Sequence, residues 1–254
     1  MHLFVYAVIF LYGIVVGSFL NVCILRIPGG ETIVSKRSHC TSCGHQLAWY
    51  DLIPLFSFLF LRGKCRYCKS KISWQYPVIE AANGILWVVT FAVRGLCLDA
   101  LLICGVISCL LVLSLIDFRY FEIPLTCNLI IGGLGIARLL LYIFIYKQNV
   151  LAERLIGFAA VAAFLLLVYF ITKGEGIGGG DIKLMAASGL FLGWKGSLLS
   201  LILGCLFGSV IHILRMKISG EGKVLAMGPY LSAGILIAML WGERIISMYI
   251  KFFN

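Results

Sequence analysis

Four of the ten cysteines have a spacing that suits a metal ion. Cys40 and Cys43 form one CxxC pair, and Cys65 and Cys68 form a second. Two such pairs can close on one tetrahedral zinc ion, each supplying two thiolates from a tight turn. A dithiol redox switch is the alternative for a CxxC pair, but two pairs together favour the metal. A shell of four cysteines leaves no position for water, so we expect the zinc to be structural.

Two aspartates stand at the ends of apolar runs in a chain that has few acidic residues. Asp117 ends one nearly uncharged run, and Asp181 follows the glycines Gly178–Gly180 and opens the next. When two carboxylates lie close together, repulsion raises one pKa and the pair shares a proton. The ionised member can then deprotonate water while the protonated member donates to a scissile carbonyl. This pair therefore predicts peptide hydrolysis without a metal or a covalent intermediate.

Each aspartate also has a purely structural interpretation. Asp181 could be the N-cap of the following helix, a position that favours Asp. Asp117 could be a solvated residue at a helix end, paired with Arg119. The glycines favour the functional interpretation of Asp181, because a cap needs one permissive residue, whereas three let a backbone or substrate approach closely.

The elements that position these residues are membrane-spanning helices, as the composition indicates. The 254 residues are 61% hydrophobic and 13% charged, whereas soluble domains are about 45–50% apolar and about 25% charged. The net charge of +10 is expected from Lys and Arg in cytoplasmic loops. No basic stretch is interleaved with aromatic residues as a single-strand nucleic-acid groove would require. We therefore expect membrane lipid, and no nucleic acid, as a partner.

Apolar runs of about 20 residues can span the hydrocarbon core as helices. They predict an all-α, polytopic membrane bundle of about eight transmembrane helices, with a small zinc-binding cytoplasmic loop domain. The expected spans are Leu3–Leu25, Pro77–Val93, Leu98–Ile116, Leu125–Tyr146, Leu155–Thr172, Ile182–Trp194, Ser197–Leu214 and Val224–Trp241.

The only long polar segment, residues 26–76, separates the first span (1–25) from the rest of the bundle (77–254). It carries eight Lys and Arg against Glu31 and Asp51, an excess that predicts a cytoplasmic location. Alternation of spans then places Asp117 and Asp181 on the cytoplasmic side as well. Fourteen Lys and Arg fall on that side against six on the other.

Together these segments resemble the bacterial type IV prepilin peptidases, which belong to the GxGD class of intramembrane aspartyl proteases. The resemblance runs through almost the entire chain in family order. Besides the two CxxC pairs, it is carried by Gly17–Asn21, Arg26–Pro28, Trp49–Asp51, Ile53–Pro54, Leu61–Cys65, Tyr76–Glu80, Asp117, Ile123–Pro124, Gly178–Leu184 and Gly228–Pro229.

The resemblance implies a multi-pass enzyme of the bacterial inner membrane with Asp117 and Asp181 as its catalytic pair. Such an enzyme cuts the leader of prepilins or pseudopilins at the cytoplasmic face, then methylates the new N-terminus from S-adenosylmethionine. The polar segment is associated with methylation, and we expect Gly63, Lys64 and Glu80 to serve the methyl donor.

Two other functions fit parts of the sequence. A transporter with a zinc-stabilised cytoplasmic loop would explain the spans and the glycine-broken helix, but it predicts an inverted repeat that the sequence lacks. A non-enzymatic assembly factor would have no need for both aspartates at one membrane depth.

Overall fold

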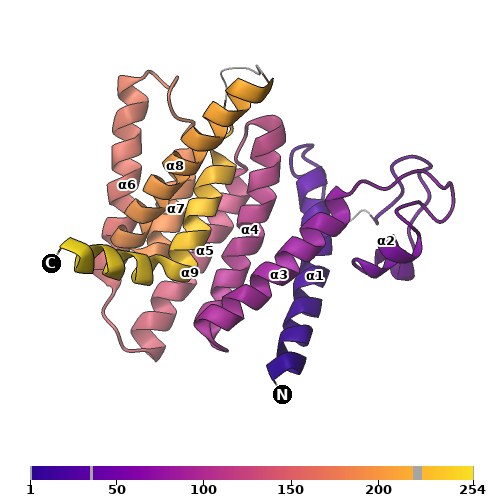
Figure 1. Ribbon diagram of the computed structural model, residues 1–254, viewed down its shortest axis with the longest axis horizontal. Helices are drawn as coiled ribbons and strands as arrows, with labels where there is room; N and C mark the ends of the chain where they lie inside the picture. The colour runs from indigo at the N-terminus through magenta and orange to yellow at the C-terminus, as the bar shows by residue number, and fades with distance from the viewer. Residues whose placement is uncertain (1, 35–36, 220–224, 254) are drawn as a thin grey trace. The chain divides into compact units, whose positions relative to one another are not determined.

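The computed structural model describes residues 2–34, 37–219 and 225–253, which are helical apart from their connections and two isolated β-bridges (Figure 1). The chain divides into two compact units, Met1–Leu96 and Cys97–Asn254. The elements of the first unit are α1 (His2–Arg26), η1 (Trp49–Leu52), α2 (Phe56–Phe60) and α3 (Gln75–Arg94). The second unit comprises α4 (Leu98–Tyr120), α5 (Leu125–Leu140), η2 (Leu141–Ile145), α6 (Leu151–Ile171), α7 (Gly179–Leu192), α8 (Trp194–Ser219) and α9 (Gly228–Phe253).

Seven helices in the described part of the chain are long and apolar enough to cross a membrane. They confirm the all-α, multi-pass membrane class. The difference from the expected eight lies in α7, whose 14 residues span only about 21 Å, less than a hydrocarbon core of about 30 Å. The last helix begins at Gly228, and its expected start, Val224, lies outside the described residues.

In the first unit, α1 and α3 pack together through small residues. A Cβ on Gly13 would lie 2.7 Å from the Cα of Gly84, and one on Gly17 would lie 2.7 Å from the Cα of Glu80. Such residues let membrane helices approach closely. The Asn83 side chain donates to the Gly13 carbonyl at 2.7 Å and links the helices further. The structure thus places α3 with α1, whereas the sequence grouped residues 77–254 together.

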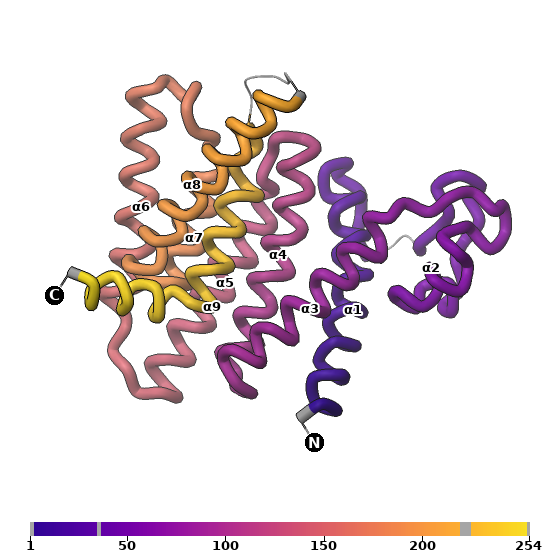
Figure 2. The backbone as a smooth tube through the Cα atoms, in the orientation of Figure 1, coloured from indigo at the N-terminus to yellow at the C-terminus, as the bar shows by residue number. Residues whose placement is uncertain are grey.

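In the second unit, α7 packs against α5, α6 and α8, and α4 packs against α5 and α9 (Figure 2). Much of α4 is buried, including Ile103, Ile107 and Leu113. The short helix α7 is likewise buried along most of its length. Asp117 stands in the last turn of α4 and Asp181 in the first turn of α7, so both aspartates belong to well-packed helix ends.

Candidate functional site

The four paired cysteines meet in the first unit. The thiol sulfurs of Cys40, Cys43, Cys65 and Cys68 all lie within 4.8 Å of one another. The Sγ atoms of Cys40 and Cys68 are 3.9 Å apart, close to the roughly 3.8 Å that tetrahedral zinc with Zn–S bonds of about 2.3 Å requires. These side chains therefore fit a closed zinc site.

The two CxxC turns have the same backbone geometry. In each, the N–H of the first cysteine donates to the carbonyl five residues later, and its carbonyl accepts from the N–H four residues later. The four bonds run from Cys40 to His45 at 2.9 Å, Gly44 to Cys40 at 2.9 Å, Cys65 to Ser70 at 2.8 Å and Lys69 to Cys65 at 3.0 Å. The backbone amides of Cys43 and Ser42 lower the pKa of Cys40 to about 6, which favours the thiolate that binds metal.

Asp51 ties the segment between the two turns to the second turn. Its carboxylate accepts from Arg66 Nε at 2.7 Å, the Tyr67 hydroxyl at 3.2 Å and the Ala48 amide at 3.3 Å. Burial opposes ionisation of Asp51, but these donors outweigh it and the pKa lies below its ordinary value. His45 stacks on Tyr67 with 3.7 Å between ring centroids. The four cysteine sulfurs already supply the four ligands of a tetrahedral zinc site, so the site needs no histidine ligand.

The expected methyl-donor residues have structural contacts. Glu80 is buried in α3, and its carboxylate accepts from the Leu55 amide at 2.8 Å. Gly63 has a positive φ of 68°, and a Cβ there would lie 3.1 Å from the Phe58 ring. Lys64 is exposed beside the second cysteine turn. The role of these three residues in methyl transfer stays a prediction.

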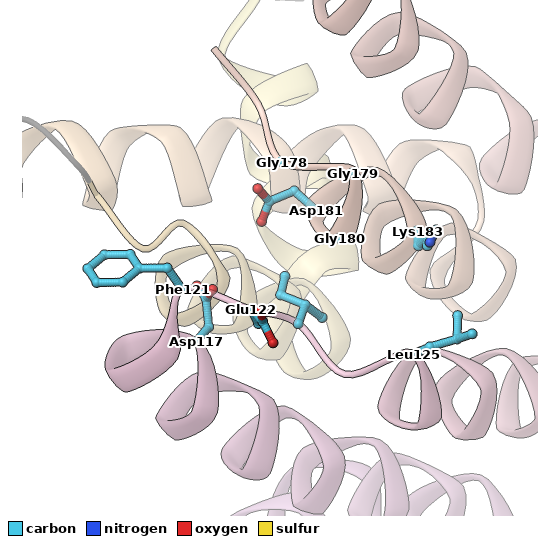
Figure 3. Close-up of a pocket in the computed structure, with 10 residues that line it drawn as sticks. Asp117, Phe121, Glu122, Leu125, Gly178, Gly179, Gly180, Asp181 and Lys183 are labelled. Carbon is cyan, nitrogen blue, oxygen red and sulfur yellow. The ribbon is translucent and has the colours of Figure 1, made fainter. Parts of the chain in front are cut away.

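The two aspartates line one cavity of about 310 Å³ in the second unit (Figure 3). Asp117 reaches it from α4 and Asp181 from α7. The remaining lining comes from the connection after α4, the first residue of α5, and the glycine run with α7. These lining residues are Phe121, Glu122, Ile123, Leu125, Gly178, Gly179, Gly180 and Lys183.

Asp117 is held by the start of α9. The Gly228 amide donates to its Oδ2 at 2.8 Å, because the first N–H groups of a helix have no partner within the helix. A Cβ on Gly228 would lie 2.7 Å from that oxygen, so any larger residue would require the Asp117 carboxylate to shift. Asp117 is 5% exposed, and its interpretation as a solvated helix-end residue is therefore wrong.

Asp181 lies in the first turn of α7, but the N-cap residue is Gly178. The N-cap interpretation of Asp181 is therefore wrong. Its Oδ1 is buried and has no hydrogen-bond partner among the described residues. Asp181 lies outside the seven candidate spans. Burial and, second, the charge of Asp117 raise its pKa to about 6, against a lowering hydrogen bond from the Gly178 backbone. Below about pH 6 most of this carboxyl group therefore carries a proton, and the protonated share falls as pH rises toward neutral.

Gly180 explains how the glycine run positions Asp181. A Cβ on Gly180 would lie 2.9 Å from Cβ of Ile123, so α7 begins in contact with the connection that follows α4. The sequence predicted a close approach at these glycines, and the structure identifies its partner. The sequence did not predict that the Gly228 amide donates to Asp117. Gly228–Pro229 was one of the motifs of the family resemblance, but it fell inside the expected span Val224–Trp241.

Comparisons with known proteins agree with this division into two parts. The family described as "Bacterial Peptidase A24 N-terminal domain" matches residues 11–93, and the "Type IV leader peptidase family" matches residues 104–213. The chain is 34% identical to a prepilin leader peptidase/N-methyltransferase of Bacillus subtilis, over 96% of this chain and 98% of the relative. It is 32% identical to one of Pseudomonas aeruginosa, over 95% and 92% of the two chains. No solved structure matches the chain. On this similarity over nearly the whole of both chains, the chain belongs to the type IV leader peptidase family.

Proposed function

We propose that this protein is an aspartyl peptidase that cuts the leader from prepilins or pseudopilins. The observation that carries the proposal is the meeting of Asp117 and Asp181 at one cavity. The family and the names of its relatives supply the substrate class. The transporter and assembly-factor alternatives lose support because the matching relatives are named as peptidases.

The surroundings of the two carboxyl groups suggest which acts as base and which as acid. The Gly228 amide at 2.8 Å stabilises an ionised Asp117, since a hydrogen bond to the charged form favours it. Asp181, with its pKa of about 6, is the better proton donor. Asp117 would take a proton from water, whose oxygen attacks the scissile carbonyl carbon, while Asp181 protonates the carbonyl oxygen. When the resulting diol collapses, one of its hydroxyl groups returns a proton to Asp181 as the carbonyl re-forms. The C–N bond breaks, and the amine leaves with the proton that Asp117 took from water.

The relatives' names include an N-methyltransferase activity, which we assign to the first unit because the family resemblance associates its polar segment with methylation. S-adenosylmethionine would supply the methyl group for the new N-terminus. The segment of residues 26–76, which a zinc ion bound by the four cysteines would stabilise, would hold this donor with Gly63, Lys64 and Glu80. The excess of Lys and Arg in this segment supports a location at the cytoplasmic face of the inner membrane.

Separate Asp117→Asn and Asp181→Asn variants test the carboxyl pair. Each should lower kcat for cleavage of a prepilin in nanodiscs by about 10²–10⁴-fold, the usual contribution of a general acid or base. The matched control is Glu122→Gln, which alters a third carboxylate lining the same cavity and should keep kcat within a few-fold. If either Asp variant cleaves at the wild-type rate, the pair is not the catalytic centre.

The Asp181→Asn variant also tests whether cleavage and methylation use separate sites. Asp181→Asn should still methylate a pre-cut peptide from radiolabelled S-adenosylmethionine, because its change lies in the second unit. Failure of this protein, with wild type active on the same peptide, would show that the two reactions share residues.

A further inference from the structure

An apolar run lies inside the otherwise polar segment that holds the cysteines. Residues 52–61 read Leu-Ile-Pro-Leu-Phe-Ser-Phe-Leu-Phe-Leu, with Ser57 as the only polar side chain. Phe58 alone in α2 is buried, and its ring packs on Trp74 at 5.0 Å between centroids. The other large side chains of α2 point outward, with Leu59 68% and Phe60 84% exposed.

We call the exposed large apolar side chains of this segment, together with two flanking tryptophans, the α2 face. Trp49 and Trp74 flank the segment in the sequence and are 77% and 71% exposed. Exposed large apolar side chains that gather on an otherwise polar segment are typical of sites of interaction. The residues of the α2 face are Trp49, Leu52, Ile53, Phe56, Leu59, Phe60 and Trp74.

The depth of α2 is fixed by a hydrogen bond to a membrane-spanning helix. Glu80 accepts from the amide of Leu55, the N-cap residue of α2, at 2.8 Å. Glu80 lies five residues inside the candidate span that begins at Gln75, or about 7–8 Å along the helix. Interfacial helices lie about 5–10 Å into the boundary between headgroups and acyl chains. With Gln75, the first residue of the candidate span, taken as the membrane boundary, the start of α2 lies at a depth that such helices occupy.

The arrangement of the first unit agrees with this depth. Figure 1 shows α2 beside the α1–α3 pair, below the upper end of α1 rather than beyond it. The Asn21 side chain donates to the Tyr76 carbonyl at 3.2 Å and fixes the start of α3 against α1. Both ends of the polar segment thus emerge from two packed spans, and α2 folds back alongside them.

The backbone of α2 is suited to an environment with little water. The amides of Leu59, Leu61 and Gly63 donate to the carbonyls of Leu55, Ser57 and Phe58 at 2.9–3.0 Å. An apolar environment requires such internal pairing. A run of ten residues, nine of them apolar, is also too short to cross a bilayer, and interfacial segments are among the structures that such short runs form.

The positive charge of the polar segment indicates which lipid headgroups it would attract. Residues 26–76 carry eight Lys and Arg against two acidic residues, and one of those acids, Asp51, pairs with Arg66 at 2.7 Å. Arg62 and Lys64 are exposed directly after the apolar run. Cations beside an interfacial segment are attracted to anionic headgroups, and tryptophans are enriched at the same level of the membrane.

We propose that the α2 face inserts into the boundary between headgroups and acyl chains of the leaflet from which α1 and α3 emerge, with anionic phospholipid as its partner. The zinc-binding segment is then a membrane-docked element and not a free loop in the cytoplasm. The proposal stands on the first unit alone and does not depend on the cleavage reaction.

A photoreactive benzoylphenylalanine at Phe60 tests the occupant directly in the full-length protein. The matched control carries the same residue at Thr41, which is exposed in the first cysteine turn and outside the α2 face. Both proteins are placed in nanodiscs of phosphatidylcholine with phosphatidylglycerol and irradiated, and the adducts are identified by mass. We expect phospholipid adducts several-fold more abundant at position 60 than at position 41, with unchanged zinc content.

Other occupants give different products. A cross-link from position 60 to residues 97–254, to a second copy or to an added prepilin, without lipid adducts, would overturn the proposal. Absence of any adduct, with efficient labelling of position 60 by a water-borne reagent, would overturn it as well. In nanodiscs of phosphatidylcholine alone the lipid adduct should fall, and an equal yield would overturn the preference for anionic lipid.

Discussion

Asp117 and Asp181 face the same cavity from different local environments. Asp117 has a backbone donor in Gly228, whereas Oδ1 of Asp181 is buried without a partner among the described residues. The difference separates the proton affinities of the two groups, which is what an acid and a base in one reaction require.

The coupling between the two carboxyl groups leads to a prediction about pH. Burial is the larger cause of the raised pKa of Asp181, about 6, and the charge of Asp117 is the second. Asp117→Asn should therefore lower the pKa of Asp181, but leave it above its ordinary value. Infrared titration of the carboxyl band with labelled aspartate would measure this shift, with Glu122→Gln as the control that leaves it unchanged. An unaltered pKa in Asp117→Asn would mean that the two groups do not interact.

The dependence of the wild-type cleavage rate on pH follows from the same pKa. A carboxyl group with a pKa of about 6 is mostly protonated below that pH and loses its proton as pH rises through it. Cleavage should therefore decline as pH rises above the pKa of Asp181, because the proton donor is lost.

Gly180 and Gly179 make a matched pair for testing the position of Asp181. A Cβ at residue 180 would lie 2.9 Å from Cβ of Ile123, whereas one at residue 179 would meet nothing within 4 Å. Gly180→Ala should displace the start of α7 and reduce kcat at least about tenfold, since a displacement of about 1 Å can cost a hundredfold. Gly179→Ala should cleave at close to the wild-type rate. Equal rates in the two variants would contradict this account of the glycine run.

At the scale of elements, α7 is anchored at the end opposite Asp181. Arg138 of α5 donates to the Phe191 carbonyl at 2.8 Å, and Arg154 of α6 donates to the same carbonyl. Arg138 also forms a two-bond ion pair with Asp99 at 2.6 and 3.0 Å. Cations near the last carbonyls of a helix are favourable, so these arginines fix the short helix that carries a catalytic candidate.

Breaking this anchor should cost stability. Arg138→Leu leaves Asp99 buried without its main partner, and removal of one member of a buried pair costs about 3–5 kcal/mol. The thermal unfolding temperature in nanodiscs should fall clearly, and the added change Asp99→Leu should recover part of the loss. Arg244→Leu, at an exposed position of α9, is the control. If the Arg138 and Arg244 variants unfold at the same temperature, the anchor contributes nothing.

The spacing of residues made some of these features predictable and concealed others. The cysteine site could be predicted from its CxxC pairs, and Asp181 from the glycine run before it, because each pattern lies within a few positions of the sequence. The Gly228–Asp117 contact joins residues 111 positions apart, and the Arg138–Asp99 pair joins residues 39 apart. Such pairs depend on helix packing, which hydropathy does not reveal. Arg138 lies inside the expected span Leu125–Tyr146, and no partner was predicted for it from the sequence. Helix α7 was predicted as a span from composition, but its length is limited by Gly193 after its last residue.

At the scale of the whole molecule, different interactions stabilise each unit. The first unit combines the close packing of α1 and α3 with the four-cysteine site, whereas the aspartate cavity lies in the second.

Loss of zinc should therefore unfold the polar segment between α1 and α3 before it affects these two helices. Cys65→Ser should lose the metal, and limited proteolysis should then cut within residues 37–74. Wild type, with close to one zinc per chain, should resist under the same conditions. A Cys65→Ser protein as resistant as wild type would contradict a structural role for the metal.

The connection between the units is short. Helix α3 ends at Arg94 and α4 begins at Leu98, so three residues join two cores that each match a separate family domain. A gene can be divided or fused at such a place without interrupting either core. Over evolutionary time, the half with the cysteines and the half with the aspartates can therefore be lost, duplicated or exchanged by recombination as independent heritable pieces.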